Sequence, residues 1–285
     1  MASLTRFDNR DIVNDISKVT TSTWTGNTNE LTAVHTSSLQ AVFSTPISLG
    51  AHFIDVYDKN PQTDTTAEVQ YSIAYGNKLG GGSKNFTNAA GALGLSPSRN
   101  IYSQYRQLVY GSETTNFNFT DYTPNDIYII NVNRSRYKHS LKPGSLNLTI
   151  GTLELTDDSV TTSGSSIVTN AGRQYNIVSG SNGTRVGSSN VIVTDSGSYG
   201  FFYPDSGFIV LNAATLDATV ATGGALLGTV TTTNNQADNH LKLRNKLITG
   251  ASFIVDSEEK ISSTYYFARA RNHEYNYTTN PSFTD

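Results

Sequence analysis

Histidine, cysteine and paired carboxylates build most hydrolytic and metal-dependent sites, and this chain supplies few usable arrangements of them. Cysteine is absent, so neither a thiolate nucleophile nor a cysteine-bound metal is available. The five histidines lack the short spacings of a metal site, and no G-x-S-x-G motif marks a serine nucleophile. They are His35, His52, His139, His240 and His273. The sequence therefore predicts no catalytic, cofactor or metal site.

Two pairs of adjacent carboxylates, Asp157-Asp158 and Glu258-Glu259, are the remaining candidates for acid–base chemistry of the glycosidase kind. Neighbouring residues on a strand point to opposite faces, so an adjacent pair does not line one cleft. We therefore expect both pairs to lie in exposed turns.

Two further motifs have plain explanations. No GKS/T signature follows Gly80-Gly81-Gly82, so a flexible loop is favoured over a phosphate cradle. The Asn-x-Ser/Thr sites are expected by chance in a chain rich in Asn and Thr, and the N-terminus lacks the apolar core of a signal peptide. These sites begin at Asn85, Asn118, Asn133, Asn147, Asn182 and Asn276.

Arginine and lysine interleaved with tyrosine form the more informative constellation. One basic set lies in 134–142 and a second in 269–271, where the chain reads RAR. Guanidinium groups pair with carboxylates across interfaces, and Tyr with Arg is the usual composition of protein–protein hot spots. An anion site and a solvated basic loop are the alternatives. The predicted assembly interface is Trp24, Arg134, Arg136, Tyr137, Lys138, Lys142, Arg269, Arg271, Tyr275, Tyr277 and Phe283.

Trp24 is the lone tryptophan and lies in a polar segment that we interpret as an extended arm. A tryptophan in an arm is often an anchor in a neighbour's pocket, and about as often it packs on its own domain. The residues after Arg271 are aromatic and amide-rich with few aliphatics, so they have little core of their own and should lie against a partner.

The central stretch 126–150 holds the first basic set between two strands. Ile127 to Val132 is a run of apolar, β-branched and aromatic residues, typical of a strand buried on both faces. Pro143-Gly144 is the favoured pair for a type II turn. Alternation from Leu146 to Ile150 predicts a half-buried strand, and Gly151 indicates a bulge after it.

Other segments complete a mainly β protein with two short peripheral helices. The first helix spans 96–110, capped by Ser96 or Ser98, with Pro97 in its first turn and Gly111 at its end. Its apolar face comprises Ile101, Tyr105, Leu108 and Val109. A weaker helix spans 236–249, with Ala237, Leu241 and Ile248 as its stripe. Strands are predicted over 39–45, 52–57, 67–75, 252–256 and 264–271, in a hairpin over 199–212, and around 216–220 and 226–230.

The expected architecture is an antiparallel β-sandwich or split barrel with extended terminal arms. Residues 1–38 form the N-terminal arm, 39–156 with 234–285 the main β domain with its helices, and 157–233 an inserted β subdomain. The 285 residues are enough to bury a core, and no window approaches eighteen apolar residues. The net charge of −3 argues against nucleic acid as a partner.

Four pieces carry a resemblance to a known class: NIYSQYRQLVYG, DIYIINVNRSRYKHSLKPGSLNL, GFFYPDSGFIVLN and YYFARARNHEYNYTTNPSF. They resemble virion structural proteins of contractile-tailed phages that infect cyanobacteria, of the tail and baseplate type. The similarity spans most of the chain from about residue 50 onward. Members of that class tend to continue past the Asn-Pro motif into another β segment, whereas this chain stops at Asp285. We expect either a short member or a tail completed by a partner.

The resemblance implies an assembly role in the virion, without catalytic residues. The expected partners are other tail or baseplate proteins, in several copies of a symmetric assembly, and the chain would be made in the host cytoplasm. A carbohydrate- or receptor-binding module on a fibre is the alternative, suggested by the abundance of Tyr, Asn and Thr. A glycosidase is a third hypothesis, and the sequence offers no acid pair for it.

Overall fold

The computed structural model describes residues 7–36, 53–82, 96–161, 166–186, 197–230, 239–250 and 252–268. Contacts divide the chain into two compact units, each described by itself below. Residues 20–258 form the unit that we call the body, and residues 1–19 with 259–285 form the ribbon unit.

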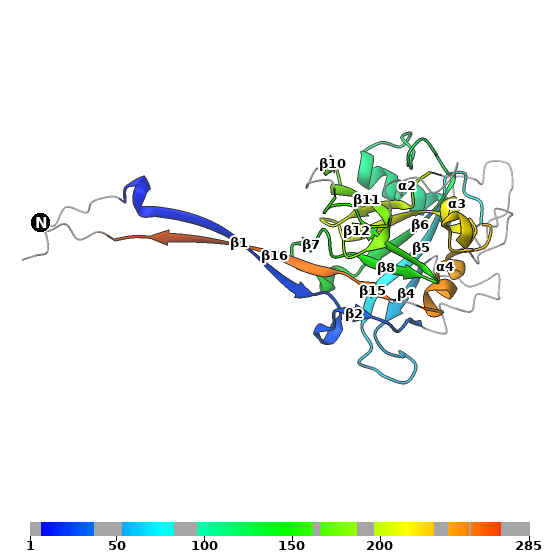
Figure 1. Cartoon of the computed structure of the whole chain (residues 1–285), viewed down its shortest axis with the longest axis horizontal. Helices are drawn as coiled ribbons and strands as arrows, with labels where there is room; N and C mark the ends of the chain where they lie inside the picture. Colours follow the sequence, from blue (N-terminus) through cyan, green and yellow to red (C-terminus); the bar gives the residue numbers. More distant parts are fainter. Residues whose placement is uncertain are drawn as a thin grey trace, which may run out of the picture. The chain divides into compact units, whose positions relative to one another are not determined.

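An antiparallel sheet, to which thirteen strands of the described residues belong, dominates the body (Figure 1). It curls into a half-barrel, which confirms the predicted mainly β class. Neighbouring strands along its main path are β2 (Glu30–Leu31), β15 (Phe253–Ile254), β8 (Asn147–Ile150), β9 (Leu153–Asp157), β11 (Gly172–Ser181), β13 (Gly200–Tyr203), β14 (Phe208–Asn212), β6 (Asp126–Val132), β5 (Val69–Asn77), β4 (Phe53–Tyr57) and β3 (His35–Thr36). Two short strands, β10 (Ile167–Thr169) and β12 (Thr184–Arg185), pair with β11.

Strand β6 lies inside this sheet and is buried on both faces, as its composition predicts. Ile130 is paired with Ile209 of β14 on one side and with Ile73 of β5 on the other. Side chains alternate along a strand, so Ile130 joins one hydrophobic core and Ile129 joins another. The two cores lie on opposite faces of the same strand.

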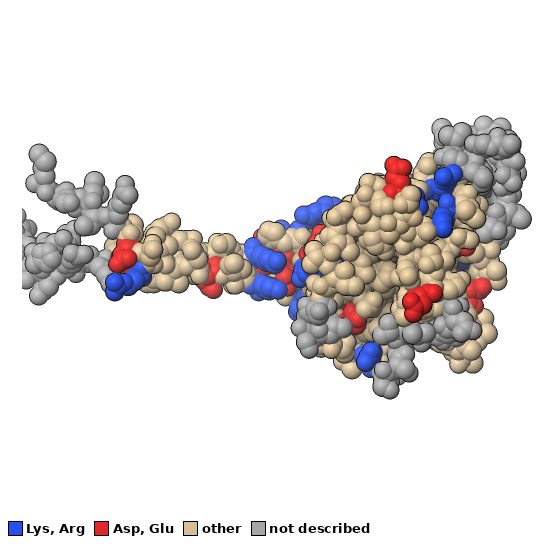
Figure 2. Space-filling model, turned by 90° about the horizontal axis from the view of Figure 1, so that it is seen from above, with Lys and Arg blue, Asp and Glu red and all other residues tan. Residues whose placement is uncertain are grey.

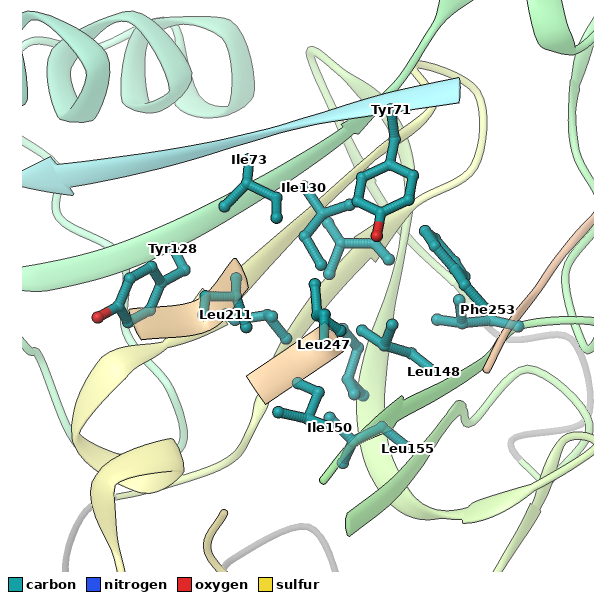
Figure 3. Close-up of a cluster of buried hydrophobic side chains, with 14 of the residues drawn as sticks. Tyr71, Ile73, Tyr128, Ile130, Leu148, Ile150, Leu155, Leu211, Leu247 and Phe253 are labelled. Atoms are coloured by element: carbon teal, nitrogen blue, oxygen red, sulfur yellow. The ribbon is translucent and has the colours of Figure 1, made fainter. Parts of the chain in front are cut away.

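The first core fills the concave side of the half-barrel. Leu247 of helix α4 (Asn239–Ile248) lies among side chains from strands that are distant along the sheet, including Ile130 of β6 and Leu148 of β8 (Figure 3). Helix α4 buries Leu243 and Leu247, whereas Ile248 is exposed, so the predicted apolar stripe is wrong.

The second core lies between the sheet and helix α2 (Pro97–Tyr110). This helix matches its prediction at both ends: Ser96 is its N-cap, Pro97 follows, and Gly111 ends it with φ +63°. A left-handed residue at this position favours glycine because it has no Cβ. The buried face differs from the prediction, since Tyr102 is buried and Leu108 is exposed.

The basic set is held as the sequence predicts, by strand, turn and strand. After β6 the chain makes a 3-10 turn at Arg134–Arg136, then forms β7 (Ser140–Leu141). Gly144 has φ +83° and the Ser145 N–H donates to the Lys142 carbonyl at 3.3 Å, which confirms the turn at Pro143-Gly144. The predicted hairpin is also present, with β13 and β14 joined around Gly207.

Three local predictions are corrected. Gly151 lies in the two-residue connection of the β8–β9 hairpin, where Ile150 is paired with Leu153, and makes no bulge. Residues 213–230 hold helix α3 (Ala213–Asp217) and a 3-10 turn (Val220–Thr222) in place of strands, because the Asn212 side chain accepts the Ala214 N–H and starts the helix. Residues 258–260 continue a strand in place of the expected charged turn.

The stretch 157–233, predicted as an inserted subdomain, contributes β11, β13 and β14 to the middle of the body's sheet. It shares one contact-defined unit with the rest of residues 20–258. Arg173 and Asp205 of this stretch form an ion pair with N–O contact at 2.6 Å.

The ribbon unit is built from parts of two long antiparallel strands, β1 (Ile12–Ser22) and β16 (Asp256–Tyr266). Residues 20–22 of β1 and 256–258 of β16 belong to the body. β1 lies in the segment 1–38 that the sequence predicts as an N-terminal arm. A 3-10 turn at Asn9–Asp11 precedes it, and the Phe267 N–H donates to the Asp11 carbonyl at 2.8 Å. Within the body, β16 also pairs with β7, Ser257 lying opposite Leu141.

Trp24 packs in the body's first core, which is the second of the two alternatives considered for it. Its side chain is 2% exposed and lies edge-on to Phe253, with ring centroids 4.9 Å apart. The indole N–H donates to the Phe253 carbonyl at 2.7 Å. The segment that follows β1 is therefore fixed to strand β15 by one buried side chain.

We predict that Trp24→Phe lowers the free energy of unfolding by about 1–3 kcal/mol, since the buried Phe253 carbonyl loses its donor. Trp24→Ala should cost more, about 3–5 kcal/mol, because it also leaves a cavity. Urea unfolding followed by circular dichroism measures both values. Equal stability of Trp24→Phe and the unchanged protein would contradict the role given to the indole N–H.

Candidate functional site

The basic loop, defined as Arg134–Lys138, is rigidly connected to the sheet. Asn133 donates its backbone N–H to the Gln70 carbonyl at 2.9 Å, and its side chain accepts the Ser135 N–H at 3.0 Å. Side-chain acceptors of this kind start a 3-10 or α-helical turn. The loop is therefore positioned by the end of β6 and by β5 beside it.

Arg136 is held by neighbours within the body. Its guanidinium forms an ion pair with Glu68 at 2.8 Å and also donates to the Thr25 hydroxyl. Thr25 in turn donates to Glu68 at 2.8 Å. Hydrogen bonds from Thr25 and Arg136 to the Glu68 carboxylate, together with the charge of Arg136, lower the pKa of Glu68.

Arg134 is bound to its own loop and also faces solvent. It donates to the Tyr137 carbonyl at 2.7 Å, and its guanidinium carbon lies 4.6 Å from the centre of the Tyr137 ring. That ring is buried and its hydroxyl donates to the Ser206 carbonyl at 3.0 Å. A side chain on Gly207 would collide with the same ring. The buried Tyr137 ring therefore orients the Arg134 guanidinium through a cation–π contact.

A hollow of about 580 Å³ lies beside this loop and is lined on the opposite side by residues 21–27. Lys138 and Arg134 are exposed at its edge, whereas Glu68 is paired with Arg136. Lys142 lies farther along the chain, with its ammonium 4.0 Å from Asp256. Inside the hollow the charges of Arg136 and Glu68 are paired, whereas two cations are exposed at its edge. This arrangement suits a carboxylate-bearing surface of another protein.

The structure brings together only part of the predicted interface. Arg134, Arg136, Tyr137 and Lys138 line one hollow, and Trp24, whose side chain is buried, also lines it. Arg269, Arg271, Tyr275, Tyr277 and Phe283 lie outside the described residues.

The carboxylate pairs have structural surroundings that the sequence does not reveal. Asp157 is fully buried and accepts the backbone N–H groups of Gly144, at 2.9 Å, and Leu146, at 3.3 Å. Burial raises the pKa of Asp157 despite these hydrogen bonds. Asp158 accepts the Asn176 N–H at 2.9 Å, so neither residue lies in the expected exposed turn. Glu258 is also buried, within β16.

The ribbon is the surface that site prediction missed. Large apolar side chains are exposed along both of its strands, among them Ile16 at 68%, Tyr265 at 53% and Tyr266 at 62%. Isolated two-stranded ribbons are at best marginally stable in water. The sequence signal for this ribbon is the alternation in TYYFARAR, which predicts a strand over 264–271 only, whereas β16 begins at Asp256.

Charge and metal chemistry add no further site in the described part of the chain. In the view of Figure 2, Lys and Arg form small groups interspersed with Asp and Glu on a mainly uncharged surface. Among described residues, no three His, Asp or Glu side chains are grouped to hold a metal, and no helix is long and apolar enough to cross a membrane. Comparison with known proteins gave no family model, curated protein or solved structure that matches this chain.

We predict that Glu68→Gln speeds hydrogen exchange at the Ser135 and Thr25 amides severalfold at neutral pH, because the Arg136 pair holds both segments. The pKa of Glu68 is lowered in the folded protein, so the pair contributes above the ordinary pKa and is lost as pH falls through the lowered value. The difference between the two proteins should therefore disappear at acid pH. Arg99→Gln, in helix α2, is the control for loss of one surface charge; equal exchange in Glu68→Gln and this control would contradict the prediction.

Proposed function

We propose that this chain is a structural subunit of a phage tail baseplate, joined to neighbouring virion proteins through the ribbon and the basic loop. The observation that carries the proposal is the ribbon, whose apolar side chains are exposed on both strands. Large exposed apolar patches are typical of interaction surfaces. Unpaired strand edges are also templates for β-augmentation by a partner.

The basic loop supports the same proposal. Arg134 and Lys138 are exposed at the edge of a hollow whose opposite wall is held by hydrogen bonds from Thr25 to Gln70 and Glu68. A preorganised cationic surface gains specificity because little ordering remains to be done on binding. The resemblance of four sequence segments to tail and baseplate proteins supplies the virion context.

A receptor-binding role is the second candidate, supported by a different hollow of about 550 Å³. Its polar lining consists of neutral amide and hydroxyl groups: Asn118, Thr120, Thr169, Asn170, Gln174 and Asn176. The aromatic residues Tyr110 and Phe201 and the aliphatic residues Val109, Ile167 and Val168 complete the wall. Neutral donors and acceptors beside aromatic rings suit a glycan, and binding on a glycan array that is lost in Asn170→Ala would favour this role.

The structural role is tested by returning ribbon variants to the phage that encodes the chain. Ile16→Ser with Tyr266→Ser should reduce the amount of this protein in purified particles by roughly tenfold, since the docking surface is polar in the variant. Val186→Ser, which alters an exposed apolar residue of the body, is the matched control and should be incorporated normally. Quantitative mass spectrometry of gradient-purified particles gives the readout. Absence of the unaltered protein from particles, or normal incorporation of the double variant, would refute the proposal.

A further inference from the structure

Two amide side chains of strand β11 line the same hollow of about 550 Å³. Gln174 and Asn176 are two positions apart on the strand, so their side chains share one face of the sheet. Tyr175 between them belongs to the first core, on the opposite face. Asn176 is paired with Phe201 of β13, which belongs to the second core. Both amides therefore lie on the side of the sheet that helix α2 covers.

The Asp158 carboxylate determines how the Asn176 side chain is turned. The Asn176 Nδ2 donates to one carboxylate oxygen at 2.8 Å, and the Asn176 backbone N–H donates to the other at 2.9 Å. A carboxylate accepts hydrogen bonds, so the amide nitrogen faces Asp158 and the amide oxygen faces away from it. Among the described residues no group donates to this oxygen, so Asn176 offers an oriented acceptor to a ligand.

Tyr203 turns the Gln174 side chain in the opposite sense. The Tyr203 hydroxyl, on a fully buried side chain, donates to the Gln174 Oε1 at 3.0 Å. Gln174 is 8% exposed, and its Nε2 has no acceptor in the part of the chain that the structure describes. Leaving a largely buried N–H without an acceptor costs free energy. Gln174 therefore offers an oriented donor that a ligand can satisfy.

An oriented donor beside an oriented acceptor is complementary to a secondary amide. The C=O and N–H of a trans amide point in opposite directions, so one can accept from Gln174 while the other donates to Asn176. Alternate positions on a strand are roughly 7 Å apart, which leaves room for one amide group between the two side chains. Val109 and Phe201, both buried, supply apolar wall that suits the methyl group of an acetamide.

We propose that this hollow binds a neutral sugar that carries an acetamido group, an N-acetylhexosamine. Its amide carbonyl accepts from the Gln174 Nε2, and its amide N–H donates to the Asn176 Oδ1. The inference rests on the receptor-binding role given to this hollow as the second candidate function, and it names the class of glycan. It does not depend on the structural role of the ribbon.

The rest of the lining favours a sugar over other amides. Its remaining polar residues are neutral donors and acceptors of the kind that ring hydroxyls need: Asn118, Thr120, Thr169 and Asn170. A peptide offers the same amide group without those hydroxyls. No Lys, Arg, Asp or Glu is among the residues that line the hollow, so a neutral sugar is favoured over a sugar acid.

The test compares sugars that differ in the acetamido group alone. Methyl glycosides of N-acetylglucosamine and N-acetylgalactosamine are titrated into the full-length protein, each beside its parent hexose, and ligand-observed NMR gives the dissociation constants. At least one acetamido sugar should bind about tenfold more tightly than its parent, because the parent lacks both amide hydrogen bonds. Saturation transferred from the protein should be strongest at the acetyl methyl group of that sugar.

A matched pair of variants separates the donor from the hydrogen bond that orients it. Gln174→Met removes the donor and should reduce the preference for the acetamido sugar below about threefold. Tyr203→Phe breaks the same Tyr203–Gln174 hydrogen bond but leaves the Gln174 nitrogen in place, so the preference should be retained. Fluorescence of the buried Trp24 verifies that each variant is folded. The comparison of sugars on the unchanged protein decides the proposal even where a variant does not fold.

The proposal is overturned if neither acetamido sugar binds, if Gln174→Met keeps the preference, or if the peptide amide N-acetylalanine methylamide binds as tightly as the sugars. It is also overturned by a preference below about threefold in the unchanged protein. Equal binding of acetamido sugars and parent hexoses would overturn this inference alone and leave the receptor-binding role standing. Absence of binding to any glycan would refute both, whereas incorporation of the protein into particles tests the structural role separately.

Discussion

Burial of β6 on both faces is the constraint on which the body depends. Ile129 and Ile130 contribute to different cores, and each fully buried side chain of this size is worth about 1.5–3 kcal/mol. Shifting the strand by one residue would exchange the side chains of the two cores, so its register is strongly specified. The position of the basic loop follows from that register, because the loop starts just after β6 and the Asn133 N–H that precedes it donates to the Gln70 carbonyl of β5.

The basic loop shows how a structure divides residues that look equivalent in the sequence. Arg134, Arg136 and Lys138 alternate along the chain, and the sequence suggested one shared role. Arg136 is partly buried and paired with Glu68, so most of its charge is satisfied within the body. Arg134 and Lys138 are exposed, and Arg134 is oriented by the buried Tyr137 ring. In the proposed docking role, specificity in this region therefore belongs to Arg134 and Lys138, while Arg136 maintains the shape of the hollow.

Sequence patterns predicted elements whose signals are local. The apolar run of β6, the Pro143-Gly144 turn, the caps of α2 and the hairpin around Gly207 each depend on residues close in sequence. The burial of Asp157 depends instead on N–H groups more than ten residues away, which no local pattern records. The buried face of α4 was missed for a related reason. The curl of the sheet determines that Leu243 and Leu247 are the buried leucines of α4, whereas in the sequence Leu241 is equally apolar.

The ribbon was missed because strand prediction relies on contrast between a buried and a solvated face. Each face of the ribbon mixes apolar, hydroxyl and charged residues, so alternation is weak and Glu259-Lys260 resembled a turn. That same mixture gives the ribbon little internal burial to offset the entropy of ordering its two strands. Binding to an ordered ribbon stabilises it by mass action, so order in this segment and occupation of its surface are thermodynamically linked. A two-stranded segment of this kind, with apolar side chains exposed on both strands, therefore gains stability from any contact that buries those side chains.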